Sequence, residues 1–96
     1  MAYRVTLQMI EQRINYLNEV TDNPKTPWTR NANGSNSANV GNYHLGGANG
    51  GVKLEQMVGP SGEERDVLSC GYTTKRDLYN RLCAMLDGIE VVRKQL

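Results

Sequence analysis

The sequence predicts a small α+β protein with an N-terminal helix, an antiparallel three-stranded sheet and a C-terminal helix. Apolar residues recur every three or four positions over residues 6–20 and 74–95, which indicates two amphipathic helices. Between them, residues 40–71 contain short apolar runs separated by glycine-rich turns, a pattern typical of an antiparallel meander. We expect residues 1–96 to form a single domain. Because so short a chain buries a modest core, we also expect a homo-oligomer, either a dimer or a larger assembly.

The first helix, expected over residues 6–20, carries a narrow apolar stripe. Its members follow steps of four and three, as in a coiled-coil seam, and are Tyr3, Leu7, Ile10, Ile14, Leu17 and Thr21. A stripe this narrow suits a helix that lies along one partner, which is either the sheet of the same chain or a second subunit. About two heptads are marginal for an isolated coiled coil, so a seam between subunits would only supplement another interface.

Residues 21–39 are expected to form a loop. Pro24 and Pro27 prevent the helix from continuing, and residues 31–39 are rich in Asn, Ser and Gly. Trp28 stands out in this polar segment. Its indole is expected either to anchor the loop on the core or on a neighbouring subunit, or to stack on the base of a ligand.

Three short strands are expected within residues 40–71. The first two, Val40–Leu45 and Gly51–Val58, flank a glycine loop over residues 46–50. The sequence GPSGEE then reverses the chain, because Pro and Gly favour turn conformations. Arg65–Gly71 is expected to form the third strand of the meander.

The second helix, expected over residues 74–95, has a clear start signal. Thr74 and Asp77 match a capping box, in which the Thr hydroxyl accepts an amide hydrogen bond and the acidic side chain reaches back. The apolar positions that follow are Leu78, Leu82, Met85, Leu86, Ile89 and Val92. Gly88 costs about 1 kcal/mol in a helix relative to alanine, which predicts that another element crosses closely there.

The charge balance argues against a DNA partner and the hydropathy against a membrane. Eleven basic and ten acidic residues give a net charge of +1 and are interspersed, without the basic stripe of a duplex DNA binder. No apolar run is long enough for a signal peptide or a membrane span. We therefore expect a cytoplasmic protein in which Cys70 and Cys83 are reduced thiols.

Motifs for catalysis and for metal binding are weak. His44 is the only histidine in the sequence, Cys70 and Cys83 form no C-x-x-C pair, and zinc sites usually need more ligands at closer spacing. No serine, histidine and acid stand at the spacing of a hydrolase motif. One acidic group, interpreted as a solvated edge, consists of Glu63, Glu64 and Asp66. We therefore expect no enzymatic activity, no metal site and no cofactor.

Anion binding is better supported, at the start of the second helix. The first amides of a helix lack intrahelical partners, and the positive end of the helix dipole attracts anions. Lys75 and Arg76 add two cations where the dipole favours acidic residues, and such a local conflict tends to mark function. The alternative is a solvated basic pair. The glycine loop adds accessible amides but lacks the G-K-[ST] pattern, so we do not expect ATP hydrolysis.

The order of three segments carries a resemblance to a known family. The chain reads IEQRINYLNEVTDNP, then NVGNYHLGGANGGVKLEQM, then ERDVLSCGYTTKRDLYNRLCAMLDGIE. This succession resembles small phage proteins over residues 10–90, in particular the anti-Thoeris sponge proteins of phages. The resemblance implies a non-enzymatic protein of the host bacterial cytosol that sequesters cyclic nucleotide immune signals. These are cyclic ADP-ribose isomers and, in some members, cyclic oligonucleotides, held in pockets shared between subunits.

The same resemblance points to particular residues. The family has an arginine at the start of its last helix, which matches Arg76. It has an aromatic residue before the second glycine pair, where this chain has Asn49. Base stacking would therefore have to come from another ring, that of Tyr43, Tyr72 or Trp28.

These considerations give each candidate a role. Arg76 would contact phosphate or stack on a base, and Lys75 would neutralise charge. Asn49 would read a polar edge, while Gly50 and Gly51 would allow close approach. The expected ligand-binding set is Arg76, Lys75, Asn49, Gly50, Gly51, Asp77, Arg65 and Tyr43.

Two alternatives remain open at this point. One is a phage protein-interaction module that inhibits a host protein through its helical surface and has no small-molecule ligand. The other is a structural phage protein in which the glycine loop is only a hairpin.

Overall fold

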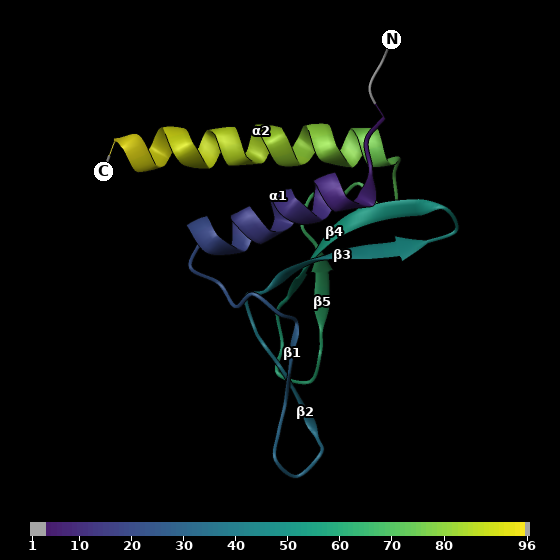
Figure 1. The fold of residues 1–96 in the computed structure, drawn as a ribbon, viewed down its shortest axis with the longest axis vertical. Coiled ribbons are helices and arrows are strands. Elements are labelled where there is room, and N and C mark those ends of the chain that lie inside the picture. The colour runs from purple at the N-terminus through teal and green to yellow at the C-terminus, as the bar shows by residue number, and fades with distance from the viewer. Residues whose placement is uncertain (1–3, 96) are drawn as a thin grey trace.

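The computed structural model describes residues 4–95, which have the α+β architecture that the sequence predicts. The elements follow in the order α1 (Leu7–Val20), β1 (Trp28–Arg30), β2 (Asn36–Ala38), β3 (Tyr43–Ala48), β4 (Gly51–Met57), β5 (Glu64–Asp66) and α2 (Lys75–Lys94). Figure 1 shows α2 above α1, α1 above the three-stranded sheet, and the β1–β2 hairpin projecting at the far end. Tyr3, the first member of the expected apolar stripe, lies outside the described residues.

The three-stranded sheet is an antiparallel meander in the order β3-β4-β5, as expected. In its register Leu45 lies opposite Leu54, His44 lies opposite Glu55, and Glu55 lies opposite Asp66. Successive residues of a strand point to opposite faces, so Leu54 enters the core while Glu55 lies on the other face. The sheet thus has one face covered by the helices and one face available for polar chemistry.

The glycine-rich connection is a tight turn, and the expectation of a five-residue loop over 46–50 was wrong. β3 continues through the first two glycines to Ala48, which pairs with Gly51. The turn itself consists of Asn49 and Gly50, whose φ angles are +52° and +79°. Positive φ at both central residues defines the type I′ hairpin turn, for which Asn-Gly is a preferred pair. The Asn49-Gly50 pair therefore determines where the turn lies, and the glycines around it belong to the strands.

The third strand is shorter than expected, covering Glu64–Asp66 in place of Arg65–Gly71. The Asp66 carboxylate accepts hydrogen bonds from the amides of Ser69, at 3.1 Å, and Gly71, at 2.7 Å. Ser69 and Gly71 have φ angles of +54° and +68°, which an extended strand cannot accommodate. The Asp66 side chain therefore ends the strand by building a turn.

The expected loop over residues 21–39 contains a second, two-stranded sheet, β1–β2. Asn31 lies at its turn, where the side-chain amide donates to the hydroxyls of Ser35, at 3.0 Å, and Ser37, at 2.8 Å. The main-chain amide of Asn31 also donates to the Ser35 carbonyl at 2.8 Å. The expectation of a loop was wrong because the Asn and Ser residues that suggested it hydrogen-bond to one another across a hairpin.

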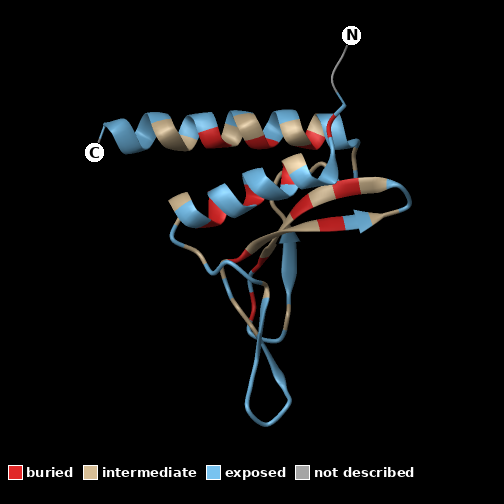
Figure 2. Ribbon diagram, viewed as in Figure 1, coloured by how far each residue is buried: buried red, intermediate tan, exposed pale blue. Residues whose placement is uncertain are grey.

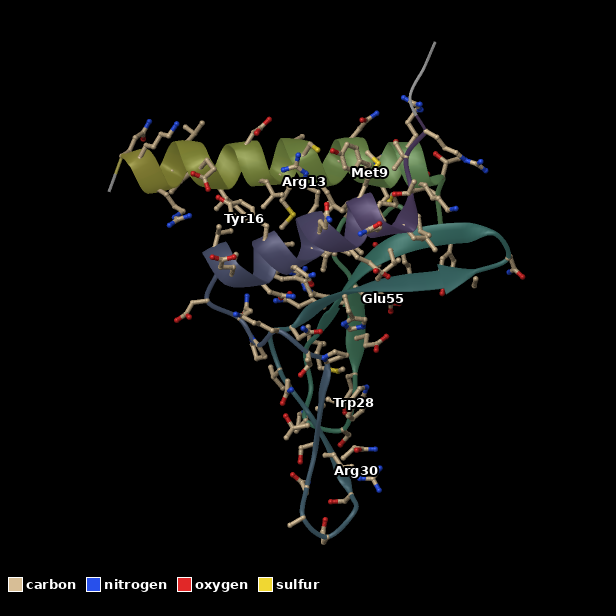
Figure 3. The ribbon with its side chains drawn as sticks, viewed as in Figure 1. Met9, Arg13, Tyr16, Trp28, Arg30 and Glu55 are labelled. Carbon is tan, nitrogen blue, oxygen red and sulfur yellow. The ribbon has the colours of Figure 1, made fainter. Side chains whose placement is uncertain are left out.

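Trp28 lies against a turn of the larger sheet, and not on the main core, where one interpretation placed it. A β-carbon at Gly62, in the turn between β4 and β5, would come within 2.7 Å of the indole. The ring therefore lies against that turn, and it remains 44 % exposed. Figure 3 labels Trp28 and Arg30 on the projecting hairpin, well away from α2.

The core lies between the two helices and the upper face of the sheet, where Figure 2 shows buried positions on α1, α2 and β4. Its buried apolar members are Val5, Ile10, Ile14, Leu17, Val52, Leu54, Leu78, Leu82 and Leu86. Ile10, Ile14 and Leu17 are at most 4 % exposed. Burying a side chain of this size contributes about 1.5–3 kcal/mol. Ile10, Ile14 and Leu17 therefore pack within their own chain, whereas Leu7 of the same stripe is 43 % exposed.

α2 starts where the sequence predicts, because the Thr74 hydroxyl accepts a hydrogen bond from the Asp77 amide at 3.1 Å. The expectation of a close crossing at Gly88 was wrong, since a β-carbon there would meet no atom within 4 Å. Neither α2 nor any other helix within residues 4–95 is long and apolar enough to cross a lipid bilayer.

Candidate functional site

The tip of the β3–β4 hairpin and the start of α2 are direct neighbours. The Val52 amide donates to the Thr73 carbonyl at 2.9 Å, and the Thr73 amide donates to the Val52 carbonyl at 2.8 Å. A β-carbon at Gly51 would lie 2.9 Å from the β-carbon of Tyr72, which is tighter than side chains allow. The absence of a side chain at Gly51 therefore lets the segment before α2 pack on the hairpin. Residues that are about twenty positions apart in the sequence meet at this place.

Lys75 and Arg76 are the first two residues of α2 and both are exposed. They lie at the helix end that carries the positive partial charge, and the first amides of a helix point outward there without intrahelical acceptors. Two cationic side chains and a helix N-terminus therefore raise the local positive potential beside the glycine hairpin.

Asp77 has a structural role at the same helix start. Its carboxylate accepts hydrogen bonds from the Thr73 hydroxyl and from Arg81 Nε, both at 2.8 Å. The Thr73 hydrogen bond, and then the Arg81 guanidinium, hold the pKa of Asp77 below its usual range. The Asp77 carboxylate raises the pKa of Arg81 in return. Asp77 thus links the hairpin-paired residue Thr73 to the helix and carries a charge that Arg81 offsets.

An aromatic ring and a third cation complete this surface. The Lys53 ammonium lies 4.5 Å from the centroid of the Tyr72 ring, within the range of a cation–π contact. The Tyr72 side chain is 47 % exposed. Lys53 is not among the expected site residues. Alternation along β4 places its side chain on the opposite face from the buried Val52, and this pattern could have identified it. We call this surface the hairpin–helix junction, and it consists of Gly50, Gly51, Lys53, Tyr72, Lys75 and Arg76.

Two of the expected site residues lie elsewhere. Tyr43 and Arg65 both lie opposite Gln56 in the sheet register, and Arg65 Nε donates to the Gln56 side-chain oxygen at 3.0 Å. Gln56 is five residues from Gly51 along β4, a separation of about 16 Å at 3.3 Å per residue. The expected set therefore divides into a group at the hairpin–helix junction and a pair at the other end of the sheet. Asn49 belongs to the junction side, as the first residue of the hairpin turn.

Three hollows of the described residues lie along α1. One, of about 280 Å³, is bordered by Lys25 and His44, and another, of about 370 Å³, by Arg13 and Tyr79. A third of about 280 Å³ is bordered by Glu19. Residues of the hairpin–helix junction border none of these three hollows. Gly50, Tyr72, Lys75 and Arg76 are exposed, so within the described residues of one chain these parts of the junction are open to solvent.

No protein-family model, curated protein or solved structure matches this chain. The resemblance to the phage sponge proteins accordingly depends on the sequence segments quoted above.

Proposed function

We propose that this protein is a non-enzymatic binding protein that captures a phosphate-bearing nucleotide at the hairpin–helix junction. The observation that carries the proposal is the packing of Gly51 against Tyr72, which joins the glycine hairpin to the basic start of α2. Anion binding at a helix N-terminus needs amides, positive charge and unobstructed approach. Gly51 and the first residues of α2 lie within a few residues of the bridge between Val52 and Thr73.

Each residue of the junction has a chemical part in this proposal. Arg76 contacts a phosphate or stacks on a base, since its planar guanidinium suits both. Lys75 neutralises phosphate charge, and Gly50 leaves the backbone accessible because a β-carbon there would meet no atom within 4 Å. The exposed ring of Tyr72 offers the stacking face that Asn49 cannot provide.

The strength that capture requires indicates a second subunit. Nanomolar affinity corresponds to about 12 kcal/mol, whereas two charge-assisted phosphate contacts supply about 1.5–3 kcal/mol each. Base stacking and exclusion of water must contribute the remainder. Because the junction of one chain is exposed, a homo-oligomer in which a second copy covers it would meet this need.

The ligand class follows from the resemblance. Cyclic ADP-ribose isomers and cyclic oligonucleotides combine phosphates with a base and so fit a surface of cations and one ring. In that role the protein is a phage anti-defence factor that removes an immune signal in the bacterial cytosol. Binding without turnover agrees with the surroundings of His44, whose ring nitrogens face Asn42 and Glu64 and not a nucleophile.

The alternative of a protein-interaction module has less support from the geometry. It requires an apolar helical surface, yet Ile10 and Ile14 of α1 are 0 % and 4 % exposed within the chain itself. Leu7 provides little apolar area on this stripe, and the other large apolar residues exposed on the described helices are Tyr16, Val91 and Val92.

A ligand screen with paired variants tests the proposal. We expect cyclic ADP-ribose isomers or cyclic di- and trinucleotides to raise the melting temperature of the wild-type protein. Replacing both Lys75 and Arg76 by alanine should weaken binding by about ten- to hundredfold per lost contact. The control replaces Arg93 and Lys94, which lie in the last turn of the same helix, and removes the same charge. Absence of any shift, or equal loss in the two variants, would reject the junction as the site and favour an interaction module.

A further inference from the structure

We propose that the open face of the three-stranded sheet binds a divalent transition-metal ion through His44, Glu55 and Glu64. One ligand atom from each of these residues lies within 4.8 Å of the other two. His44 Nε2 and Glu64 Oε1 are 3.1 Å apart. Figure 3 shows Glu55 on the side of the sheet away from α1. This inference does not depend on the nucleotide proposal, although Lys53 of the hairpin–helix junction lies on the same face of β4 as Glu55.

The strand register builds the cluster. His44 of β3 lies directly opposite Glu55 of β4, so the two side chains project from the same face of the sheet. Glu64 of β5 lies opposite Met57, two residues along the same face from Glu55, and reaches the pair diagonally. Three strands thus each supply one ligand, which sequence spacing did not reveal because the nearest two are separated by nine residues or more.

Gly46 makes room for the Glu55 carboxylate. A β-carbon at Gly46 would collide with the carboxylate of Glu55, and Gly46 itself is buried. The Glu55 side chain therefore lies across the backbone of β3 at this point. A glycine in a strand interior often marks a place where another group approaches the backbone closely. At Gly46 that group is the carboxylate of Glu55, one of the three proposed ligands.

Asn42 fixes which nitrogen of His44 faces the carboxylates. Asn42 is 1 % exposed, and its side-chain nitrogen donates to the Pro24 carbonyl at 2.8 Å. Its oxygen therefore faces His44 Nδ1, at 3.0 Å, and accepts the Nδ1 proton. In the neutral ring this leaves the lone pair of Nε2 pointing at Glu64. A second group that holds the far ring nitrogen in this way is the usual support of a metal-binding histidine.

With the His44 ring neutral, the three converging atoms are all acceptors, and either a proton on Nε2 or a metal ion is needed between them. Nε2 and two carboxylates cannot hydrogen-bond to one another without added protons, and a metal ion satisfies all three at once. Lys53 lies on the same face of the sheet, and its ammonium lies over the Tyr72 ring. Asp66 is committed to the amides of Ser69 and Gly71.

The donor set favours zinc among the common divalent ions. Zinc accepts imidazole nitrogen and carboxylate oxygen at about 2.0–2.2 Å, so its ligand atoms lie about 3.4 Å apart in a tetrahedron. His44 Nε2 and Glu64 Oε1, at 3.1 Å, are already about this far apart. A pair at the 4.8 Å limit of the cluster would have to close by about 1.4 Å, which rotation of the Glu55 and Glu64 side chains can provide. Three protein ligands leave one position for water or another ligand.

Direct titration of the tag-free, chelator-treated protein tests the site. We expect isothermal titration to give one Zn²⁺ per chain, and Co²⁺ to produce the visible absorption of a site with few ligands. Glu64→Gln and His44→Gln should each weaken Zn²⁺ binding by about tenfold or more, in the range seen when a metal site loses a partner. The control is Glu63→Gln, which changes the neighbouring exposed carboxylate and should leave binding unchanged. Circular dichroism of each variant establishes that it is folded.

Two results would overturn the inference. One is the absence of saturable binding of either ion to the wild-type protein. The other is equal affinity in the wild type and in a folded Glu64→Gln variant, which would move the ion to another part of the chain. Because Glu64 lies on a short edge strand, its substitution keeps the test decisive even if the His44 variant fails to fold.

Discussion

Gly51 and Tyr72 lie so close that a β-carbon on the glycine would be 2.9 Å from the β-carbon of the tyrosine. This packing makes the end of one hairpin and the start of a distant helix into one continuous surface. It also aligns the Tyr72 ring with the Lys53 ammonium, 4.5 Å from its centroid. The arrangement depends on the lack of a side chain at Gly51.

Gly51→Ala should therefore separate the hairpin from the segment before α2 and lower nucleotide affinity by about tenfold or more, equivalent to about 1.4 kcal/mol. Gly47→Ala is the matched control in the same hairpin, because its β-carbon would meet only an ordinary contact at 3.7 Å. Calorimetric titration of both variants measures the effect. Equal affinity in Gly51→Ala and wild type would show that the contact does not shape the site.

Acid should weaken the start of α2 through Asp77. The pKa of Asp77 lies below its ordinary value of 3.8, first through the Thr73 hydroxyl and then through Arg81. A carboxylate of this kind adds stability above its unfolded-state pKa, and that stability is lost as the pH falls through its folded-state pKa.

Asp77→Asn should thus lower the urea midpoint at about pH 7, and the difference from wild type should shrink at about pH 3. Asp87→Asn removes an exposed carboxylate from the same helix and serves as the control. A difference that stays constant with pH would contradict the assigned role of Asp77.

Asn18 should be a main determinant of stability. Its side chain is 1 % exposed, donates to the Tyr43 carbonyl at 2.9 Å and accepts from the Tyr43 amide at 2.8 Å. Asn18→Ala leaves both backbone groups without these partners, at a cost of about 1–3 kcal/mol for each unsatisfied group. We expect urea unfolding to show a loss of about 2–3 kcal/mol, whereas the exposed Asn15→Ala should change little. A loss in Asn18→Ala no larger than in Asn15→Ala would contradict this.

Gly88→Ala should stabilise the protein by about 1 kcal/mol, the difference between the two residues in a helix interior. Nothing lies within 4 Å of the added methyl group, so no clash offsets the gain. Thermal unfolding measures the change, and a lower melting temperature would mean that another subunit approaches α2 at this position.

Local signals predicted the helices and the order of the sheet. Thr74 marked the start of α2, and the spacing of Leu78, Leu82 and Leu86 marked its buried side. The Asn49-Gly50 pair was sufficient to predict a two-residue hairpin turn, but the surrounding glycines suggested a longer loop. These features depend on residues within a few positions of one another, which a sequence records directly.

Long-range pairings could not be predicted in the same way. The proximity of Gly51 to Tyr72, and of His44 to Glu55 and Glu64, depends on strand register and on how α2 meets the sheet. Tyr43 and Arg65 were included in the expected site because of their residue types, but the strand register places both opposite Gln56, away from the hairpin turn. Such contacts arise only after the elements have packed.

The central claim is that the protein holds a nucleotide signal at the hairpin–helix junction without altering it. The most direct test mixes a cyclic ADP-ribose isomer with excess protein, separates the protein by ultrafiltration, and then heats it to release what it holds. We predict that the nucleotide disappears from the filtrate and is recovered chemically intact after heating. A nucleotide that stays in the filtrate, or that returns hydrolysed, would contradict the account.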